Sequence, residues 1–190
     1  WVDSTADTVD ANPGDGVAQD SSGNTSLRAA IMEANATEGA SRILLPAGTY
    51  NLSIAGTDED QGATGDLDIT DNLTIIGATA DSTIIDAGRI DRVFHIMDDA
   101  VVKISGVTIT GGESVGSSGI YFIAGTSLTV DSAVIRNNIS SSSAGGIGGS
   151  GDLVVNASTI SGNKANGSSA GGIGAGHGTI TITNTTISGN

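Results

Sequence analysis

Acidic side chains are the residues of this chain whose type and spacing best fit a chemical role. Carboxylate oxygens are the ligands that calcium prefers, and three groups of acids lie close enough in sequence to share an ion. The groups are Asp3, Asp7, Asp10 and Asp15; Asp58, Glu59 and Asp60; and Asp66, Asp68 and Asp71. Because alternate residues of a strand face the same side, we predict the calcium site at Asp66, Asp68 and Asp71. The alternative is a solvated acidic surface.

Catalysis has less support than metal binding. Polysaccharide cleavage needs two carboxylates about 5–10 Å apart, or a carboxylate–calcium cluster beside a basic residue. His177 stands between glycines, without paired aspartates one repeat earlier, and His95 is interpreted as a packed or solvated strand residue. The chain has no cysteine, which excludes thiolate catalysis and cysteine metal sites. We therefore expect no catalytic residue, and no cofactor other than calcium.

Glycosylation sequons are the second chemical excess. Eight of the 12 asparagines begin an Asn-x-Ser/Thr triplet, which favours modification along a secretory route, with turn formation as the alternative. The candidates are Asn24, Asn35, Asn51, Asn72, Asn138, Asn156, Asn166 and Asn184.

The charge of the chain excludes some partners. A net charge of −14 with only seven basic residues argues against a nucleic-acid surface, which needs clustered lysine and arginine. The acids are concentrated: residues 1–100 hold 18 acidic and four basic groups, whereas residues 101–190 hold three of each. No apolar run reaches the roughly 18–20 residues of a membrane helix, so we expect no membrane insertion.

An internal repeat must position these side chains. Segments 102–109, 128–135, 153–160 and 180–187 alternate apolar and polar residues, and they begin 26, 25 and 27 residues apart. Such alternation indicates strands with one face buried. The repeat gives three apolar columns: Val102, Leu128, Leu153 and Ile180; Val93, Ile120, Ile147 and Ile173; and Ile109, Ile135, Ile160 and Ile187. Three short strands per repeat predict an all-β fold, a right-handed parallel β-helix of about 26 residues per coil.

The first half of the chain is expected to open and cap this stack. Residues 1–42 are predicted to be an extended segment and a short capping helix, and residues 43–190 the coils, with an acidic loop inserted near 56–65. Leu27, Ile31 and Ala34 have helical spacing, and Thr25 or Ser26 can cap the helix. Asn138, Asn163 and Asn190 follow the third column and are expected to stack along the axis.

The N-terminal segment resembles a known family. Residues 3–7 (DSTAD), 10–16 (DANPGDG) and 26–31 (SLRAAI) are similar to the CSLREA-type N-terminal domain that precedes right-handed parallel β-helices of bacterial and archaeal surface or secreted proteins. Two cysteines of that pattern are replaced here by Ala18 and Thr25, and its glutamate by Ala29. The resemblance implies a solenoid and a cell-surface setting, and no chemistry.

Function is therefore expected from architecture. We expect a non-enzymatic, extracellular or cell-surface, structural or adhesive β-solenoid, with surface polysaccharide as a candidate partner. Because no closing helix follows Ile187, self-association end to end into a filament, or more of the same chain, is expected to cover the last coil. The alternatives are a carbohydrate-active enzyme or carbohydrate-binding module of the pectate-lyase-like β-helix class, and a calcium-stabilised stalk.

Overall fold

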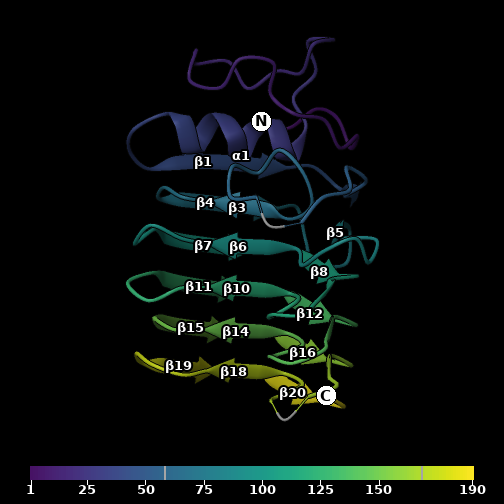
Figure 1. Ribbon diagram of the computed structural model, residues 1–190, viewed down its shortest axis with the longest axis vertical. Coiled ribbons are helices and arrows are strands. Elements are labelled where there is room, and N and C mark those ends of the chain that lie inside the picture. Colours follow the sequence, from purple (N-terminus) through teal and green to yellow (C-terminus); the bar gives the residue numbers. More distant parts are fainter. Residues whose placement is uncertain (58, 168) are drawn as a thin grey trace.

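Parallel strands stacked in coils make up almost the whole molecule. The computed structural model describes residues 1–57, 59–167 and 169–190, which form one α-helix, α1 (Leu27–Ala36), and 20 β-strands. The helix lies across the N-terminal end of the stack (Figure 1). It has 10 residues, and among the described residues no helix is long and apolar enough to cross a membrane.

Three long sheets and one short sheet run along the stack. The first contains β1 (Ser41–Leu45), β4 (Leu73–Gly77), β7 (Val101–Ser105), β11 (Ser127–Asp131), β15 (Asp152–Asn156) and β19 (Ile180–Thr183). The second contains β2 (Gly48–Asn51), β5 (Thr83–Asp86), β8 (Thr108–Thr110), β12 (Val134–Arg136), β16 (Thr159–Ser161) and β20 (Thr186–Ser188). The third contains β3 (Leu67–Ile69), β6 (Phe94–Ile96), β10 (Ile120–Phe122), β14 (Ile147–Gly149) and β18 (Ile173–Ala175). The short fourth sheet contains β9 (Glu113–Ser114), β13 (Ile139–Ser140) and β17 (Lys164–Ala165).

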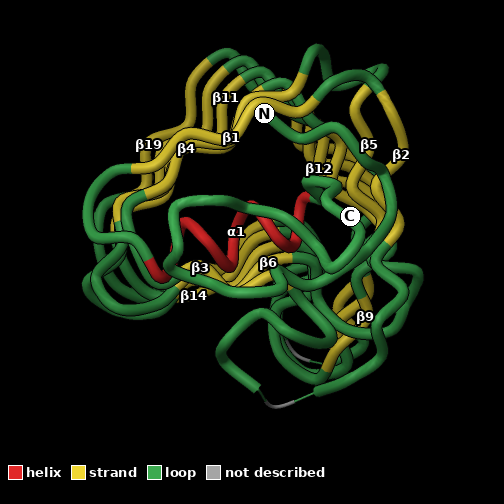
Figure 2. Tube along the Cα trace, turned by 90° about the horizontal axis from the view of Figure 1, so that it is seen from above, coloured by secondary structure: helices red, strands yellow, loops and turns green. Residues whose placement is uncertain are grey.

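The coil is right-handed. Seen from above, the chain runs clockwise from β1 through β2 and β3 to β4 while it descends away from the N-terminal end (Figures 1 and 2). All strand pairs are parallel, for example β4 with β7 and β11 with β15. The predicted all-β parallel β-helix with a short helix near its N-terminus is confirmed, and its coils hold about 26 residues each.

The apolar columns form the core. Val102, Leu128, Leu153 and Ile180 are direct partners in adjacent strands, as are Ile109, Ile135, Ile160 and Ile187. The register of two of the three predicted columns is therefore confirmed, whereas their last members, Ile180 and Ile187, are 43% and 46% exposed rather than buried. Burial of such side chains is the main stabilising contribution, because each removes apolar surface from water.

The remaining column differs by one residue at its first member. Ile120 pairs with Phe94 rather than with the predicted Val93, and below them Ile147 pairs with Ile173. Val93 is also fully buried, because it occupies the corner just before β6. A buried residue at a corner is therefore as apolar as a buried strand residue, and the sequence pattern alone does not distinguish the two.

The helix begins and packs as its sequence predicts. Ser26 is the N-cap, and its hydroxyl oxygen accepts a hydrogen bond from Ala29 N at 3.0 Å. Leu27, Ile31 and Ala34 are buried against the first coil. This helix covers the apolar residues that would otherwise be exposed at the N-terminal end.

A buried asparagine ladder runs beside the second sheet. Asn138 Nδ2 donates to Asn163 Oδ1 at 3.0 Å, and Asn163 Nδ2 donates to Asn190 Oδ1 at 2.9 Å. Each amide nitrogen also donates to a strand carbonyl of the coil above, and each amide oxygen accepts from the backbone. The predicted asparagine stack is confirmed, and the polar side-chain atoms of its buried members, Asn138 and Asn163, are satisfied, whereas Asn190 is exposed.

Replacing Ile160 by aspartate should test the core register. The unpaired charge would be buried between Ile135 and Ile187, and we expect the free energy of unfolding to fall by about 4 kcal/mol or more. Urea denaturation followed by circular dichroism measures this loss. Val154→Asp on the outer face of the preceding strand is the matched control, with an expected loss below about 0.5 kcal/mol. Equal losses in the two variants would contradict the register.

Candidate functional site

A polar cleft lies on the outer side of β3, β6 and β10. It is a cleft of about 260 Å³ below the loop that joins β2 to β3. Its lining residues are Glu59, Asp60, Asp66, Asp91, Arg92 and His95. The cleft therefore gathers acids from the loop and the sheet around two basic side chains.

Coil register builds one wall of the cleft. Asp68 of β3 pairs with His95 of β6, which in turn pairs with Tyr121 of β10. Since their neighbours Leu67, Phe94 and Ile120 point into the core, these three side chains point outward in a column. The His95 and Tyr121 rings stack with their centroids 5.1 Å apart at an interplanar angle of 22°.

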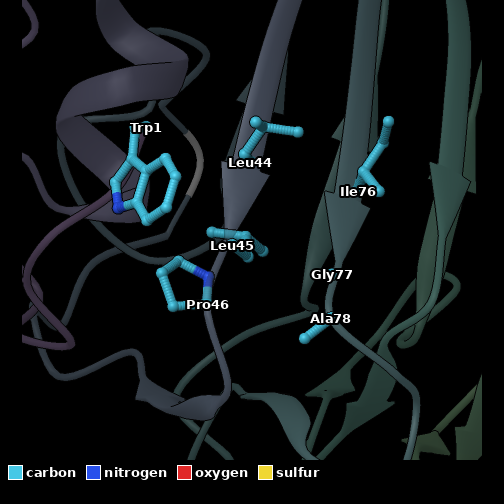
Figure 3. A pocket seen from close by; sticks show the side chains of 7 residues that line it. All are labelled: Trp1, Leu44, Leu45, Pro46, Ile76, Gly77 and Ala78. Atoms are coloured by element: carbon cyan, nitrogen blue, oxygen red, sulfur yellow. The ribbon is translucent and has the colours of Figure 1, made fainter.

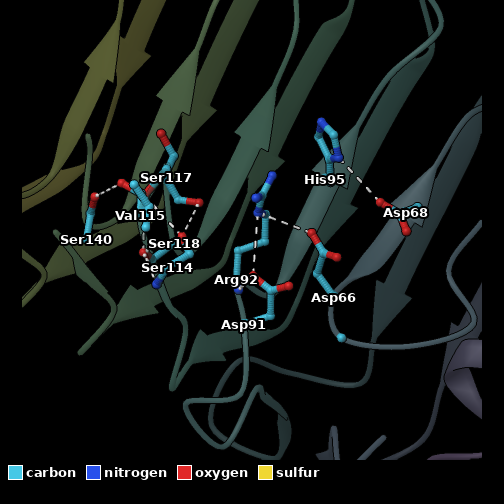
Figure 4. Close-up of polar contacts among 12 residues, drawn as sticks. Asp66, Asp68, Asp91, Arg92, His95, Ser114, Val115, Ser117, Ser118 and Ser140 are labelled. Atoms are coloured by element: carbon cyan, nitrogen blue, oxygen red, sulfur yellow. Dashed lines mark hydrogen bonds and ion pairs between the residues drawn. The ribbon is translucent and has the colours of Figure 1, made fainter. Parts of the chain in front are cut away.

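Arg92 bridges the acids at the edge of the column. Its Nε lies 3.2 Å from Asp66 Oδ2 and 3.9 Å from Asp91 Oδ1 (Figure 4). Its guanidinium carbon lies 5.4 Å from the centre of the Tyr121 ring, which is within cation–π range. The arginine therefore offsets part of the acidic charge and rests on the aromatic column.

Asp66 is a perturbed carboxyl group. Its pKa is raised from 3.8 to about 8, chiefly by burial and also by the neighbouring Asp68 and Asp91 carboxylates, against the lowering effect of Arg92. Perturbed groups of this kind cluster at functional sites, although structural networks produce them too.

Asp68 is the most deeply placed acid. Its side chain is 0% exposed, and its Oδ2 accepts a hydrogen bond from Gly62 N at 2.9 Å. Its Oδ1 has no hydrogen-bond partner and lies 3.4 Å from His95 Nδ1 (Figure 4). Asp60 Oδ1 lies 3.6 Å from the same histidine nitrogen. The ligating atoms of Asp60, Asp68 and His95 all lie within 4.8 Å of one another, so this arrangement could hold a cation.

Arg28 holds the loop in place over the sheet. Its guanidinium is buried and donates to both Asp7 carboxylate oxygens, from Nε at 2.6 Å and from Nη2 at 3.3 Å. It also donates to the carbonyl oxygens of Gly62, Gly65 and Asp66 at 2.8 to 2.9 Å. A guanidinium has five N–H donors, and all five are used here. The loop around the cleft is thus tied to α1 and to the N-terminal segment.

The structure brings together only part of the predicted calcium set. Asp66 and Asp68 line or adjoin the cleft, whereas Asp71 lies in the turn after β3 and accepts from the backbone N–H groups of Gly39 and Asn72. Calcium binding at these three residues stays a prediction, and the donors that converge are instead Asp60, Asp68 and His95.

The other acidic groups stabilise turns and contacts. Asp7 pairs with Arg28, Asp3 accepts from Thr25 N, and Asp10 and Asp15 accept from backbone N–H groups two residues later. Glu59 accepts from Gln61 N and Thr64 N, while Asp58 lies outside the described residues.

His177 lies far from this chemistry. It is exposed in the turn between β18 and β19, where its carbonyl oxygen accepts from Gly151 N. His95, in contrast, is the histidine that belongs to the cleft. The interpretation of His95 as a simple packed or solvated residue missed its acidic partners.

The sequons differ in accessibility. Four of the candidates are exposed, namely Asn24, Asn51, Asn166 and Asn184. Asn35, Asn72 and Asn156 are half-buried and hydrogen-bonded to neighbouring chain. Asn138 is fully buried, and its Nδ2 donates within the asparagine ladder, so a glycan cannot reach this nitrogen in the folded chain. Glycosylation stays a prediction for the exposed positions.

A group of hydrogen-bonded serines lies outside the cleft. Beside β9, the Ser114 and Ser118 hydroxyls bond to each other at 3.0 Å and to nearby carbonyls, an arrangement that closes a turn (Figure 4).

At the N-terminal edge, a groove of about 290 Å³ lies between Trp1 and the strand ends at Pro46 and Ala78 (Figure 3). Trp1 is 79% exposed there.

Spacing could have identified the outward column of Asp68, His95 and Tyr121, which forms one wall of the cleft. The intervals from Asp68 to His95 and from His95 to Tyr121 are 27 and 26 residues, which equal the coil length. Asp91 and Arg92 precede the same strand, β6, and come to the edge of the column with it. Asp60 could not be placed in this way, because its position depends on the loop conformation.

Comparisons with known proteins find no similar sequence or structure. No protein-family model, curated protein or solved structure gives a significant match to this chain. The fold class therefore rests on the coordinates, and the chemistry on the cleft geometry.

The raised pKa of Asp66 predicts a pH dependence of stability. Between 3.8 and about 8 the folded chain holds a proton that the unfolded chain has released. The free energy of unfolding should therefore fall as pH rises through this window. Asp66→Asn, which cannot titrate, should flatten the slope, and Asp71→Asn outside the cleft is the matched control. Urea denaturation between about pH 5 and about pH 8, without added metal, measures it. An unchanged slope in Asp66→Asn would contradict the assignment.

Proposed function

We propose that this protein is a structural β-solenoid of an extracellular or cell-surface setting whose coil of β18, β19 and β20 stacks on a further coil, either of the same protein or of a second copy, and that residues 1–190 alone associate end to end through this coil. The observation that carries the proposal is the exposure of Ile180, Ile182 and Ile187, which are 43%, 42% and 46% accessible. Their direct partners one coil earlier, Leu153, Val155 and Ile160, are all 0% accessible. The same apolar columns are therefore covered inside the stack and open at its end.

Unpaired backbone accompanies the open apolar columns. β18, β19 and β20 are each the terminal strand of their sheet. A terminal strand presents N–H and C=O groups that can pair with another strand, and solenoids normally cover such edges. Apolar columns and strand edges on one face favour another coil as the partner of this surface.

The opposite end of the stack differs. α1 covers the first coil, and the segment before it packs on its own chain, since Val2 is buried and Val2 N donates to Leu44 O. In a preparation of these 190 residues, the second coil has to come from another copy. The covered N-terminal end supports pairing of two C-terminal coils as the first step, before any filament.

The surface setting rests on sequence features. The DSTAD and SLRAAI segments resemble the CSLREA-type domain, and four exposed sequons are compatible with secretion. Adhesion to a surface polysaccharide would use the outer faces of the sheets.

Introducing a charge into the exposed apolar surface of β19 should test the association. Ile182→Lys places a charge in the proposed interface, and we expect it to weaken self-association by about tenfold or more. Thr181→Lys adds the same charge to the neighbouring outward position of β19 and should leave association unchanged. Sedimentation velocity across a concentration series measures both. A wild-type chain that stays monomeric throughout would contradict the proposal.

A carbohydrate-active enzyme or binding module is the second candidate. The observation in its favour is Arg92 beside Asp66 and Asp91 in an open acidic cleft, which matches the requirement for carboxylates next to a basic group. This candidate predicts that acidic polysaccharide such as polygalacturonate or alginate releases reducing ends in the presence of calcium. Arg92→Lys should abolish the release, because lysine lacks the planar fork. No release by the wild-type protein would remove the enzyme.

A further inference from the structure

We propose that Asp60, Asp68 and His95 bind a divalent transition-metal ion of the zinc class at the loop–sheet junction. The donors are Asp60 Oδ1, Asp68 Oδ1 and His95 Nδ1. This inference is independent of the end-to-end association, because the cleft lies on the side of the stack near its N-terminal end.

The distances between the donor atoms fit such an ion. His95 Nδ1 lies 3.4 Å from Asp68 Oδ1 and 3.6 Å from Asp60 Oδ1. Zinc bonds of about 2.0–2.1 Å in a tetrahedral arrangement place neighbouring donors about 3.3–3.4 Å apart. The two distances from His95 Nδ1 therefore fit a shared ion, and the Asp60 and Asp68 ligand atoms lie within 4.8 Å of each other, a gap that movement of the exposed Asp60 side chain can close.

The buried Asp68 oxygen is an observation separate from the acidic character of the cleft. Asp68 is 0% exposed, and its Oδ1 has no hydrogen-bond partner. Its Oδ2 is held by Gly62 N at 2.9 Å, which fixes the carboxylate plane and aims Oδ1 at His95. A buried carboxylate oxygen without a hydrogen-bond partner is costly, and a bound cation would satisfy it.

The donor set favours a transition metal over calcium. Calcium takes six to eight oxygen ligands, whereas imidazole nitrogen is a ligand for zinc and its neighbours in the first transition row. Asp60 has a side chain that is 71% exposed, so an ion can enter from the cleft and the loop carboxylate can close on it. Three protein ligands leave a fourth position open to the cleft.

Two features of the cleft oppose tight binding of the ion. The Arg92 charge lies in the same cleft and opposes a cation. His95 Nε2 is buried without a hydrogen-bond partner, so the histidine lacks the acceptor that usually orients a metal-binding imidazole. A bound ion would link the 52–66 loop to β3 and β6.

Isothermal titration calorimetry of the tag-free, metal-free chain with zinc chloride and with calcium chloride tests the site. We expect one zinc ion per chain, bound more tightly than calcium. His95→Gln and Asp60→Asn should each weaken zinc binding by about tenfold or more. The matched controls are His177→Gln and Asp71→Asn, which alter the same residue types outside the cleft and should bind as the wild type does.

The outcomes separate clearly. Asp60 is exposed, so Asp60→Asn should keep the fold, and circular dichroism verifies this for every variant. Zinc affinity that is unchanged in Asp60→Asn or His95→Gln would overturn the inference. Calcium bound more tightly than zinc, or no zinc binding at millimolar concentration, would overturn it as well.

Discussion

The register of the parallel coils is the constraint on which the rest of the structure depends. Hydrogen bonds between successive coils place each strand residue over its partner about one coil away in sequence, as in Leu128 over Leu153. Because side chains alternate between two faces, a slip of one residue would turn every inward isoleucine outward and every outward acid inward. The same register that closes the core therefore aligns Asp68, His95 and Tyr121 on the surface. One strand register therefore determines both which residues pack in the core and which residues meet on the surface.

The two ends of the stack differ in whether their apolar core residues are covered. At the N-terminal end, Arg28 joins Asp7, α1 and the loop carbonyls in one buried network. Breaking a buried pair of this kind leaves an uncompensated charge, so the cap and the loop are expected to depend on each other. The loop in turn carries Asp60 to the cleft, which links the cap to the proposed metal site. At the C-terminal end, Ile180, Ile182 and Ile187 remain open, and the proposed function follows from that difference.

The fold could be predicted from the sequence because a solenoid repeats its burial pattern at a constant interval. The columns through Leu128 and Ile135 were predicted residue by residue, and the error at Val93 arose because a buried corner also selects an apolar residue. The candidate site was predicted only in part. Asp66 and Asp68 were identified, but Asp71 was wrongly grouped with them, because it lies three residues after Asp68, out of the alternation, and β3 ends at Ile69. His95 and Arg92 follow from coil spacing, whereas Asp60 depends on the Arg28-held loop, which has no periodic signal.

Anomalous diffraction from a crystal of the zinc-loaded protein, recorded at the zinc absorption edge, tests most directly the claim that coil register creates surface chemistry. The account predicts one strong peak within about 2.3 Å of both Asp68 Oδ1 and His95 Nδ1, with Asp60 closing on the same peak. It also predicts that Asp68 and His95 remain direct partners in adjacent strands. A zinc peak elsewhere on the chain with this cleft vacant, or a register in which Asp68 and His95 are not partners, would contradict the account.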